Sequence, residues 1–349
     1  MKLPMIACAA ALMMLPQTVV AQPAGGEPVS IGTTYSIPAT AFEGDRRVTV
    51  RLPAGYAEQP EMKFPVVYVI DGGPEQDFPH IAGIAQSRDM NWSFGRFILV
   101  GIETVNRRAE ISPPVRPEAL AEYEESLGAT PGGSENFRRF IAEDVKPWVE
   151  ANFRTDGHDA VMGESLAGLF IMETLMKQPE LFDDWIAVSP SMWFDDMKLA
   201  REAASMMPAA AGGKERIYLT LANEGYRHEE GVERLVDALR SSAPADWKWA
   251  YVPLNDSETH GTIYHTAALD AFRLLYGEPH REYRPAGEMV GGPADPRTDA
   301  EQAILDTECS ADNTVSTTPG AAAMGRGRLF YRCLSLDLGP RAREGTLVP

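Results

Sequence analysis

The sequence is poor in cysteine and in long apolar runs, and both shortages narrow what the protein can be. Only three cysteines occur in 349 residues, and no neighbouring Cys or His completes a zinc-ligand pattern. We therefore expect no metal and no other cofactor. After the first 21 residues, no stretch is long and apolar enough to predict a transmembrane helix. We therefore expect no stable membrane insertion.

Basic residues are also in deficit. The chain has 32 Lys and Arg against 50 Asp and Glu, which gives a formal net charge of −18. A chain this acidic repels polyanions, so nucleic acid is not expected as a partner. The composition does not indicate an oligomeric state.

The first 21 residues have the pattern of an export signal. Lys2 supplies a positive start, residues 6–15 are apolar, and residues 19–21 are small or β-branched before Gln22. A short apolar core followed by a small-residue cleavage site is typical of a signal peptide. Residues 1–21 are therefore predicted to be removed, and the protein is expected to be periplasmic or secreted.

The C-terminal segment differs in composition from the rest of the chain. Residues 286–349 are rich in Pro, Gly, Asp and Thr over most of their length, and we expect a loosely ordered appendix. Cys309 and Cys333 both lie there. In an exported protein they are expected to form a disulfide, with two free thiols as the alternative. Residues 22–285 remain as the expected catalytic domain.

Short continuous apolar segments recur through this domain. Such segments are typical of strands buried on both faces of a parallel sheet, and helical patterns separate several of them. Their alternation predicts an α/β protein with helices on both faces of a mostly parallel sheet. Two earlier segments, 34–38 and 47–52, alternate as antiparallel strands do. The buried strands are expected at 64–70, 97–102, 160–162, 185–188, 217–221 and 249–254.

Helical periodicity is clear in four segments. Apolar residues fall on one face of 134–149, where Ser134 is expected to cap the helix and Pro147 to bend or split it. Residues 166–176 are apolar nearly all round, which predicts a helix under the centre of the sheet. Segments 232–239 and 266–275 are amphipathic.

The most informative motif is Gly163-Glu164-Ser165-Leu166-Ala167-Gly168. It joins the strand at 160–162 to the apolar helix, with a serine at the corner. This is the pattern of the nucleophile elbow of α/β-hydrolases, G-x-S-x-G, with Ala167 in place of the second glycine. A serine in an ordinary glycine-flanked turn is the alternative.

A serine nucleophile needs a base, and the base needs an acid behind it. In the hydrolase fold the chain order is serine, acid, histidine. Of six histidines, His260 lies in the loop between the last strand and the last helix, where the base is required. Glu224 directly follows the penultimate strand and is the expected acid. The neighbouring carboxylates that could replace it are Glu229, Glu230, Asp256 and Glu258.

The developing oxyanion also needs backbone N–H donors. One is expected from Leu166, the residue after the nucleophile. The other is expected from Gly72 or Gly73, which follow an early buried strand and allow a close approach of the backbone.

Taken together, these motifs resemble the Putative esterase family, which includes S-formylglutathione hydrolase, feruloyl esterases, mycolyltransferases and ferric-siderophore esterases. The resemblance covers about residues 30–280. Besides the serine motif, the segments that carry it are 64–72, 100–108, 188–193 and 259–261. It implies an α/β-hydrolase fold with a minimal lid, Ser165 as nucleophile and His260 as base. Since some siderophore esterases of this family are thought to use a Ser-His pair alone, the role of Glu224 stays open.

The expected function is that of a serine carboxylic-ester hydrolase acting on a small-molecule ester through an acyl-enzyme. A siderophore ester is one candidate substrate, and a feruloyl or acetyl carbohydrate ester is another. Acyl transfer by the same intermediate and an idle ligand-binding protein are the alternatives. Trp193 could form a wall of the pocket or pack in the core. The basic residues Arg107, Arg108 and Arg116 could bind an anionic group or lie solvated in a loop. The short segment 197–213 predicts an open cleft.

Overall fold

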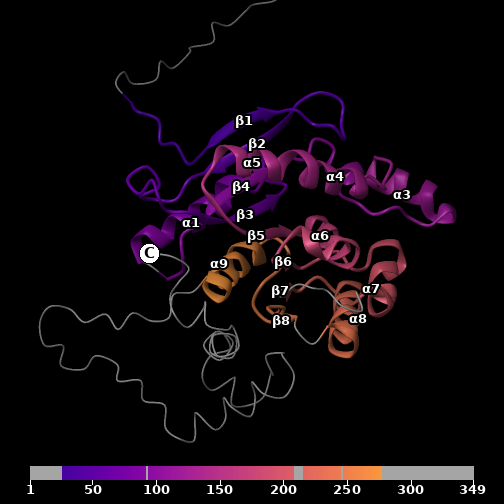
Figure 1. The fold of residues 1–349 in the computed structure, drawn as a ribbon. Coiled ribbons are helices and arrows are strands. Elements are labelled where there is room, and N and C mark those ends of the chain that lie inside the picture. Colours follow the sequence, from indigo (N-terminus) through magenta and orange to yellow (C-terminus); the bar gives the residue numbers. More distant parts are fainter. Residues whose placement is uncertain (1–25, 92, 208–214, 245–246, 277–349) are drawn as a thin grey trace, which may run out of the picture. The chain divides into compact units, whose positions relative to one another are not determined.

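The expected parallel strands form the centre of the structure. The computed structural model describes residues 26–91, 93–207, 215–244 and 247–276. Within these residues one sheet has eight strands in the order β1-β2-β4-β3-β5-β6-β7-β8 (Figure 1). The first two pairings, β1 with β2 and β2 with β4, are antiparallel, and all others are parallel. The strands are β1 (Thr33–Ile37), β2 (Arg46–Arg51), β3 (Phe64–Ile70), β4 (Ile98–Ile102), β5 (Thr155–Glu164), β6 (Asp184–Val188), β7 (Arg216–Leu221) and β8 (Lys248–Pro253).

The sequence prediction of the strands is confirmed at all eight positions. Every residue of β3, β4 and β6 is buried, as continuous apolar segments require. The largest difference is in β5, which begins five residues before the predicted segment. Its first residues are mostly polar and partly exposed, so they carry no apolar signal. The predicted signal peptide, the appendix and the Cys309–Cys333 disulfide lie outside the described residues.

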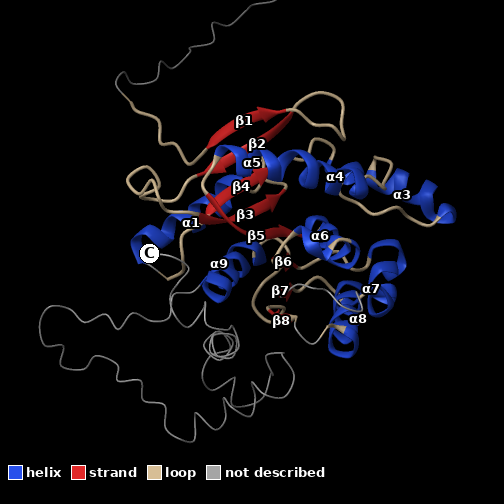
Figure 2. Cartoon of the chain, in the orientation of Figure 1, coloured by secondary structure: helices blue, strands red, loops and turns tan. Residues whose placement is uncertain are grey.

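Helices cover both faces of the sheet, as expected (Figure 2). On one face, residues of α1 and α9 belong to the same buried cluster as Val67 and Val69 of β3. On the other, residues of α4 to α8 belong to the cluster that includes Val66, Tyr68 and Ile70. None of the described helices is long and apolar enough to cross a membrane. The helices are α1 (Phe78–Asn91), α2 (Arg107–Glu110), α3 (Leu120–Leu127), α4 (Ser134–Phe140), α5 (Lys146–Asn152), α6 (Leu166–Lys177), α7 (Phe194–Met206), α8 (Tyr226–Ser242) and α9 (Ile263–Tyr276).

An irregularity is present near Pro147, but the helix is not broken there. The helical backbone continues from α4 to α5 through a π-helical turn over Ile141–Val145, and Pro147, which has no N–H to donate, lies in the first turn of α5. The capping prediction was wrong by one residue. Gly133 is the N-cap, and Ser134 is buried as the first helical residue. A Cβ atom at Gly133 would lie 2.5 Å from the Ala109 carbonyl oxygen, so the chain approaches too closely there for a side chain.

Helix α7 corrects the interpretation of 197–213 as a short connection, because this segment contains most of that helix. Asp195, Asp196 and Met197 have φ values of 48° to 60°, in the left-handed region, and they interrupt its first turn. The carboxylate of Asp195 accepts hydrogen bonds from the backbone N–H and the guanidinium of Arg116. These contacts fix a backbone conformation that periodicity does not predict.

Candidate active site

The parallel strands place the elbow, the acid and the base at one edge of the sheet. Strands β5, β6, β7 and β8 run in the same direction, so the loops that follow them meet at their carboxyl ends. The β7–β8 pairing continues into these loops through a parallel bridge between Asn223 and Thr259. The Asn223 N–H also donates to the Glu258 carbonyl oxygen at 2.8 Å. Glu224 and His260, one residue after each partner of the bridge, are therefore held side by side.

Ser165 occupies the predicted elbow. Strand β5 ends at Glu164 and α6 begins at Leu166, so the whole turn falls on Ser165, with φ 61° and ψ −116°. A non-glycine residue in this region costs about 1–3 kcal/mol, and such strain is concentrated at functional sites. A Cβ atom at Gly163 would lie 2.6 Å from the Cβ of Ala167, which explains why small residues flank the serine. The N–H of Leu166, the first residue of α6, has no partner within its helix.

Backbone hydrogen bonds hold this corner against the next strand. The Ser165 N–H donates to the Val188 carbonyl oxygen at 2.9 Å, and the Ser165 carbonyl oxygen accepts from the Ser191 N–H at 3.0 Å. The Ser165 carbonyl oxygen also accepts from the Leu169 N–H at 2.9 Å, within the first turn of α6. The main chain of Ser165 is therefore fixed on both sides, while its hydroxyl faces a cavity.

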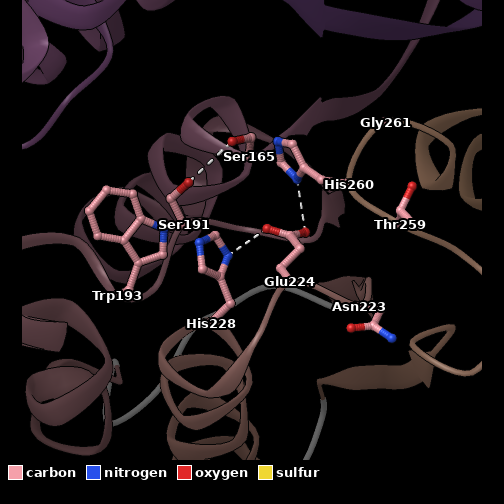
Figure 3. Close-up of a pocket in the computed structure, with 9 residues that line it drawn as sticks. All are labelled: Ser165, Ser191, Trp193, Asn223, Glu224, His228, Thr259, His260 and Gly261. Carbon is pink, nitrogen blue, oxygen red and sulfur yellow. Dashed lines mark hydrogen bonds and ion pairs between the residues drawn. The ribbon is translucent and has the colours of Figure 1, made fainter.

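The expected base and acid are in contact. His260 Nδ1 lies 2.8 Å from Glu224 Oε1 (Figure 3). With Nδ1 against the carboxylate, the other ring nitrogen is turned toward the side of Ser165. The Ser165 hydroxyl lies 3.2 Å from the Ser191 hydroxyl. A rotation of the Ser165 side chain toward the ring would complete the pairing, as is common in sites without substrate.

Glu224 is the most constrained carboxylate of the site. Its side chain is 6% exposed. Its second oxygen lies 2.5 Å from His228 Nδ1, and the Ser189 hydroxyl donates to Oε1. Burial alone would raise the pKa of Glu224. The hydrogen bonds from His228, His260 and Ser189 outweigh burial and lower this pKa to about 2. Glu224 is therefore an anion at every working pH and can orient an imidazole.

The same contact affects the base. The hydrogen bond to Glu224 raises the pKa of His260 above its ordinary value, in spite of partial burial. The charge of Glu164 acts in the same direction. Burial in turn raises the pKa of Glu164 to about 7. The charges of Glu164 and His260 therefore influence each other's pKa.

The two glycines expected in the oxyanion hole differ in what they can do. The Gly72 N–H donates to the Ile102 carbonyl oxygen at 2.8 Å, so it is engaged with β4 and is not free for a substrate. This corrects the prediction for Gly72. The Gly73 N–H donates to Gln76 Oε1 at 2.9 Å. A side-chain acceptor can be displaced by a substrate oxygen, so Gly73 stays a candidate.

The three arginines are separated by their partners. Arg107 lies beside the elbow, because its Nη2 donates to the Glu164 carbonyl oxygen at 3.3 Å. Its Nε is 2.5 Å from Asp71 Oδ2. Arg108 donates to the Leu127 carbonyl oxygen at 2.7 Å. Arg116 is paired with Asp195, as described above. The structure therefore does not gather these residues into one basic cluster.

The cavity beside Ser165 has a volume of about 530 Å³, within the range of small-molecule sites. Trp193 lies in its wall, as one of the two sequence interpretations had it. Among the described residues, no group of three or more His, Cys, Asp or Glu side chains could hold a metal ion. The lining residues are Ser165, Ser191, Trp193, Asn223, Glu224, His228, Thr259, His260 and Gly261.

Sequence reasoning missed three polar residues of the site. His228 lies in the first turn of α8, four residues after Glu224, which precedes the helix. Ser189 and Ser191 belong to the run 188–193, which was used only for the resemblance. Because Gly225 turns the chain between Glu224 and α8, helical spacing does not predict the contact of His228 with Glu224. Nothing in the sequence indicates that Ser189 donates to Glu224.

A serine at the strand–helix elbow, with a histidine and a carboxylate from later loops of a mostly parallel sheet, defines an α/β-hydrolase. Residues 39–261 match the model of the family described as Putative esterase. Because this match covers more than half of the chain, the protein belongs to that family.

Two curated relatives are similar over part of the chain. One is the siderophore enterobactin esterase of Emericella nidulans, 34% identical over 102 residues, which are 28% of this chain and 32% of the relative. The other is the ferri-bacillibactin esterase BesA of Bacillus subtilis, 33% identical over 92 residues, which are 26% and 32% of the two chains. The chain thus spans about a third of the length of these relatives.

Among solved structures, the chain is similar to an IroE-like serine hydrolase from Shewanella oneidensis. The TM-score is 0.63 at 24% identity, over 70% of this chain and 80% of the other. At this identity the likeness supports the shared fold. The predicted α/β-hydrolase fold is therefore confirmed.

Proposed function

We propose that the protein is a serine carboxylic-ester hydrolase. Ser165 Oγ attacks the ester carbonyl carbon while His260 accepts the hydroxyl proton. Glu224 stabilises the imidazolium that forms. The N–H of Leu166 and, once Gln76 is displaced, the N–H of Gly73 stabilise the oxyanion. His260 then donates the proton to the leaving alcohol, and an acyl-enzyme remains on Ser165.

The second half of the reaction uses the same groups. A water molecule gives a proton to His260 and attacks the acyl carbonyl carbon. The tetrahedral intermediate collapses, the carboxylic acid leaves, and the proton returns to Ser165. The observation that carries this proposal is the 2.8 Å contact between His260 Nδ1 and Glu224 Oε1 beside a serine at the elbow.

Covalent labelling tests the nucleophile directly. A fluorophosphonate probe is expected to modify Ser165, because such probes trap an activated serine. Mass spectrometry of the labelled peptide identifies the residue. Labelling of Ser191, whose hydroxyl is 3.2 Å away, would assign the nucleophile to Ser191 instead. The absence of any labelling would support the alternative of an idle ligand-binding protein.

For the substrate class we propose esters of siderophore type, since one curated relative is named as a siderophore enterobactin esterase and the other as a ferri-bacillibactin esterase. A panel of siderophore trilactones, feruloyl sugars and short acyl esters tests this. The trilactones are expected to give the highest kcat/KM. A preference for feruloyl sugars, or a new ester product when a sugar acceptor is added, would favour the alternative enzymes. We also propose export, which the signal-peptide pattern of residues 1–21 supports.

The pH dependence of hydrolysis follows from the pKa of His260. The base must be neutral to accept a proton, so the rate rises as the pH rises through this pKa. Since Glu224 raises it, the midpoint of the acid limb of kcat/KM is expected above the ordinary histidine value of about 6.5. A pH profile on a short acyl ester measures this midpoint.

The variant Glu164→Gln sharpens that measurement. Removing a carboxylate that raises the pKa of His260 is expected to move the acid limb to lower pH. Glu229→Gln, in the first turn of α8, serves as the matched control and should leave the midpoint in place. If the midpoint of the acid limb is the same in Glu164→Gln as in the wild type, Glu164 does not raise the pKa of His260.

A further inference from the structure

The segment that follows β6 lies between the elbow and the loop that carries Glu224. Strand β6 pairs with β5, which ends at the elbow, and with β7, which leads to Glu224. The Ser165 N–H donates to the Val188 carbonyl oxygen, and the Ser191 N–H donates to the Ser165 carbonyl oxygen. Ser189 lies between these two contacts, so its place relative to the nucleophile is fixed.

Two helices pack closely against this segment. A Cβ atom at Gly168 of α6 would lie 3.0 Å from the Cα of Pro190. A Cβ atom at Gly231 of α8 would lie 2.8 Å from the carbonyl carbon of Met192. The contacts are so close that the segment has no room to shift toward either helix. Ser189 itself has no exposed surface, which keeps bulk water away from its hydroxyl.

The hydrogen bonds of Ser189 fix where its hydroxyl proton lies. Ser189 Oγ accepts from the Ala222 N–H at 3.0 Å and donates its own proton to Glu224 Oε1. A hydroxyl has one proton to give, so this proton is committed to the acid. The Ser189 N–H also donates to Thr220 Oγ1 at 3.1 Å. Ser189 is thus tied at three points to the end of β7 and the residues that follow it.

The backbone of Ser189 lies in a region that favours glycine. Its φ is 40°. A non-glycine residue with such a φ is strained, and strained residues are concentrated at functional sites. The hydroxyl is therefore present at a position where the backbone alone would favour a residue without a side chain.

Glu224 Oε1 is the oxygen on which Ser189 and the base meet. His260 Nδ1 lies 2.8 Å from this oxygen, and the Ser189 hydroxyl is its second donor. The two donors differ in support, because His260 lies in a loop and its side chain is 45% exposed, whereas Ser189 is packed in the interior. Hydrogen bonds to an ionised acceptor are strong. Without the Ser189 hydroxyl, the carboxylate could rotate away from the imidazole.

We infer that Ser189 is a positioning residue for ester hydrolysis: its hydroxyl holds the Glu224 carboxylate in the orientation that supports His260. Because Ser189 has no exposed surface, it touches neither the substrate nor the reacting atoms and acts through Glu224. This inference rests on the proposed esterase function and adds one residue to its machinery.

Removal of the hydroxyl is the first test. Ser189→Ala is expected to lower kcat on a short acyl ester by ~10- to 100-fold, the range for one hydrogen bond to a charged group. KM should change by less than ~2-fold, because an acid that supports the imidazolium acts in the transition state and the cavity lining is unchanged. A loss caused by a deformed cavity would instead raise KM.

Ser112→Ala is the matched control. Ser112 is also fully buried, and its Oγ accepts from the Gly132 N–H at 3.3 Å and donates to the Arg108 carbonyl oxygen at 2.6 Å. The control therefore deletes a hydroxyl and deprives a backbone N–H of its acceptor, as Ser189→Ala does, but without a bond to Glu224. It should lower the thermal transition and leave kcat close to the wild-type value.

Ser189→Gly separates the hydroxyl from the backbone strain. Glycine adopts a φ of 40° easily, so this variant should have a thermal transition at least as high as that of Ser189→Ala. Since it also lacks the hydroxyl, its kcat should be as low as that of Ser189→Ala. A wild-type kcat in Ser189→Gly would show that the hydroxyl has no role.

A double-mutant cycle tests whether Ser189 acts through Glu224. In the Glu224→Gln background the carboxylate is absent, so adding Ser189→Ala should lower kcat by less than ~3-fold further. If the two reductions multiply instead, Ser189 acts independently of the acid and the inference is wrong.

The remaining outcomes separate the inference from the function. If wild-type protein hydrolyses the ester and Ser189→Ala keeps its kcat, the positioning role is rejected and the esterase function stands. If Glu224→Gln itself keeps a wild-type kcat, there is no acid to position, and the inference is rejected while Ser165 and His260 keep their roles. If wild-type protein hydrolyses no ester, the proposed function fails and the inference with it.

Discussion

Replacing Ser165 with alanine is expected to lower kcat/KM on a short acyl ester by about 10⁴-fold or more, because no acyl-enzyme can form without the hydroxyl. The rate should be followed with enough protein to measure the residual activity. The same variant should take no fluorophosphonate label. Since alanine keeps the backbone and most of the packing, the thermal transition should stay close to that of the wild type.

The neighbouring hydroxyl provides the comparison for this result. Ser191→Ala removes the group that lies 3.2 Å from Ser165 Oγ but leaves the elbow intact. It should retain labelling at Ser165. If Ser165→Ala kept a wild-type rate while Ser191→Ala lost it, the assignment of the nucleophile would be wrong.

The second large effect is expected at Glu224. Glu224→Gln should lower kcat/KM by about 10³- to 10⁴-fold, because an amide can hold the imidazole in the wrong tautomer and does not stabilise its charged form. The variant also loses the negative charge that raises the pKa of His260. Its acid limb should therefore shift to lower pH even as the rate falls. This shift would not accompany a loss caused by misfolding alone.

Glu229→Gln is again the control, since it makes the same chemical change in the first turn of α8. We expect it to retain most of the activity. A small effect of Glu224→Gln on both rate and pH profile would support a Ser-His pair acting alone. A large effect of Glu229→Gln would mean that the acid lies there instead.

The sheet could be predicted closely because burial on both faces leaves a direct trace in the sequence. A segment such as Phe64–Ile70 must be apolar at every position, and its boundaries follow from where polar residues resume. Helices α1 and α7 left no such trace. The first turn of α7 contains three left-handed residues, and one of them, Asp195, is held by Arg116 from a distant part of the chain. Such contacts are visible only once the chain is folded.

The site divides in the same way. The proximity of Ser165, Glu224 and His260 could be predicted because the fold fixes the chain order of the loops that meet at this edge of the sheet. The role of Gly72 could not be predicted, because the use of its N–H depends on how β3 lies against β4. A Cβ atom there would be 2.3 Å from the Cα of Gly101, so this glycine is required by strand packing rather than by substrate. The sequence shows a glycine whether strand packing or a bound substrate requires it, so it does not distinguish the two roles.

The backbone conformation of Ser165 has a consequence for attempts to stabilise the protein. A glycine adopts φ near 61° without strain, whereas serine does not, so the residue best suited to the corner is not the one that can react. Thermal robustness and turnover therefore make opposite demands on this position. A screen that selects only for heat resistance would tend to replace Ser165 and so abolish activity. Libraries intended to keep activity should therefore leave Ser165 unchanged.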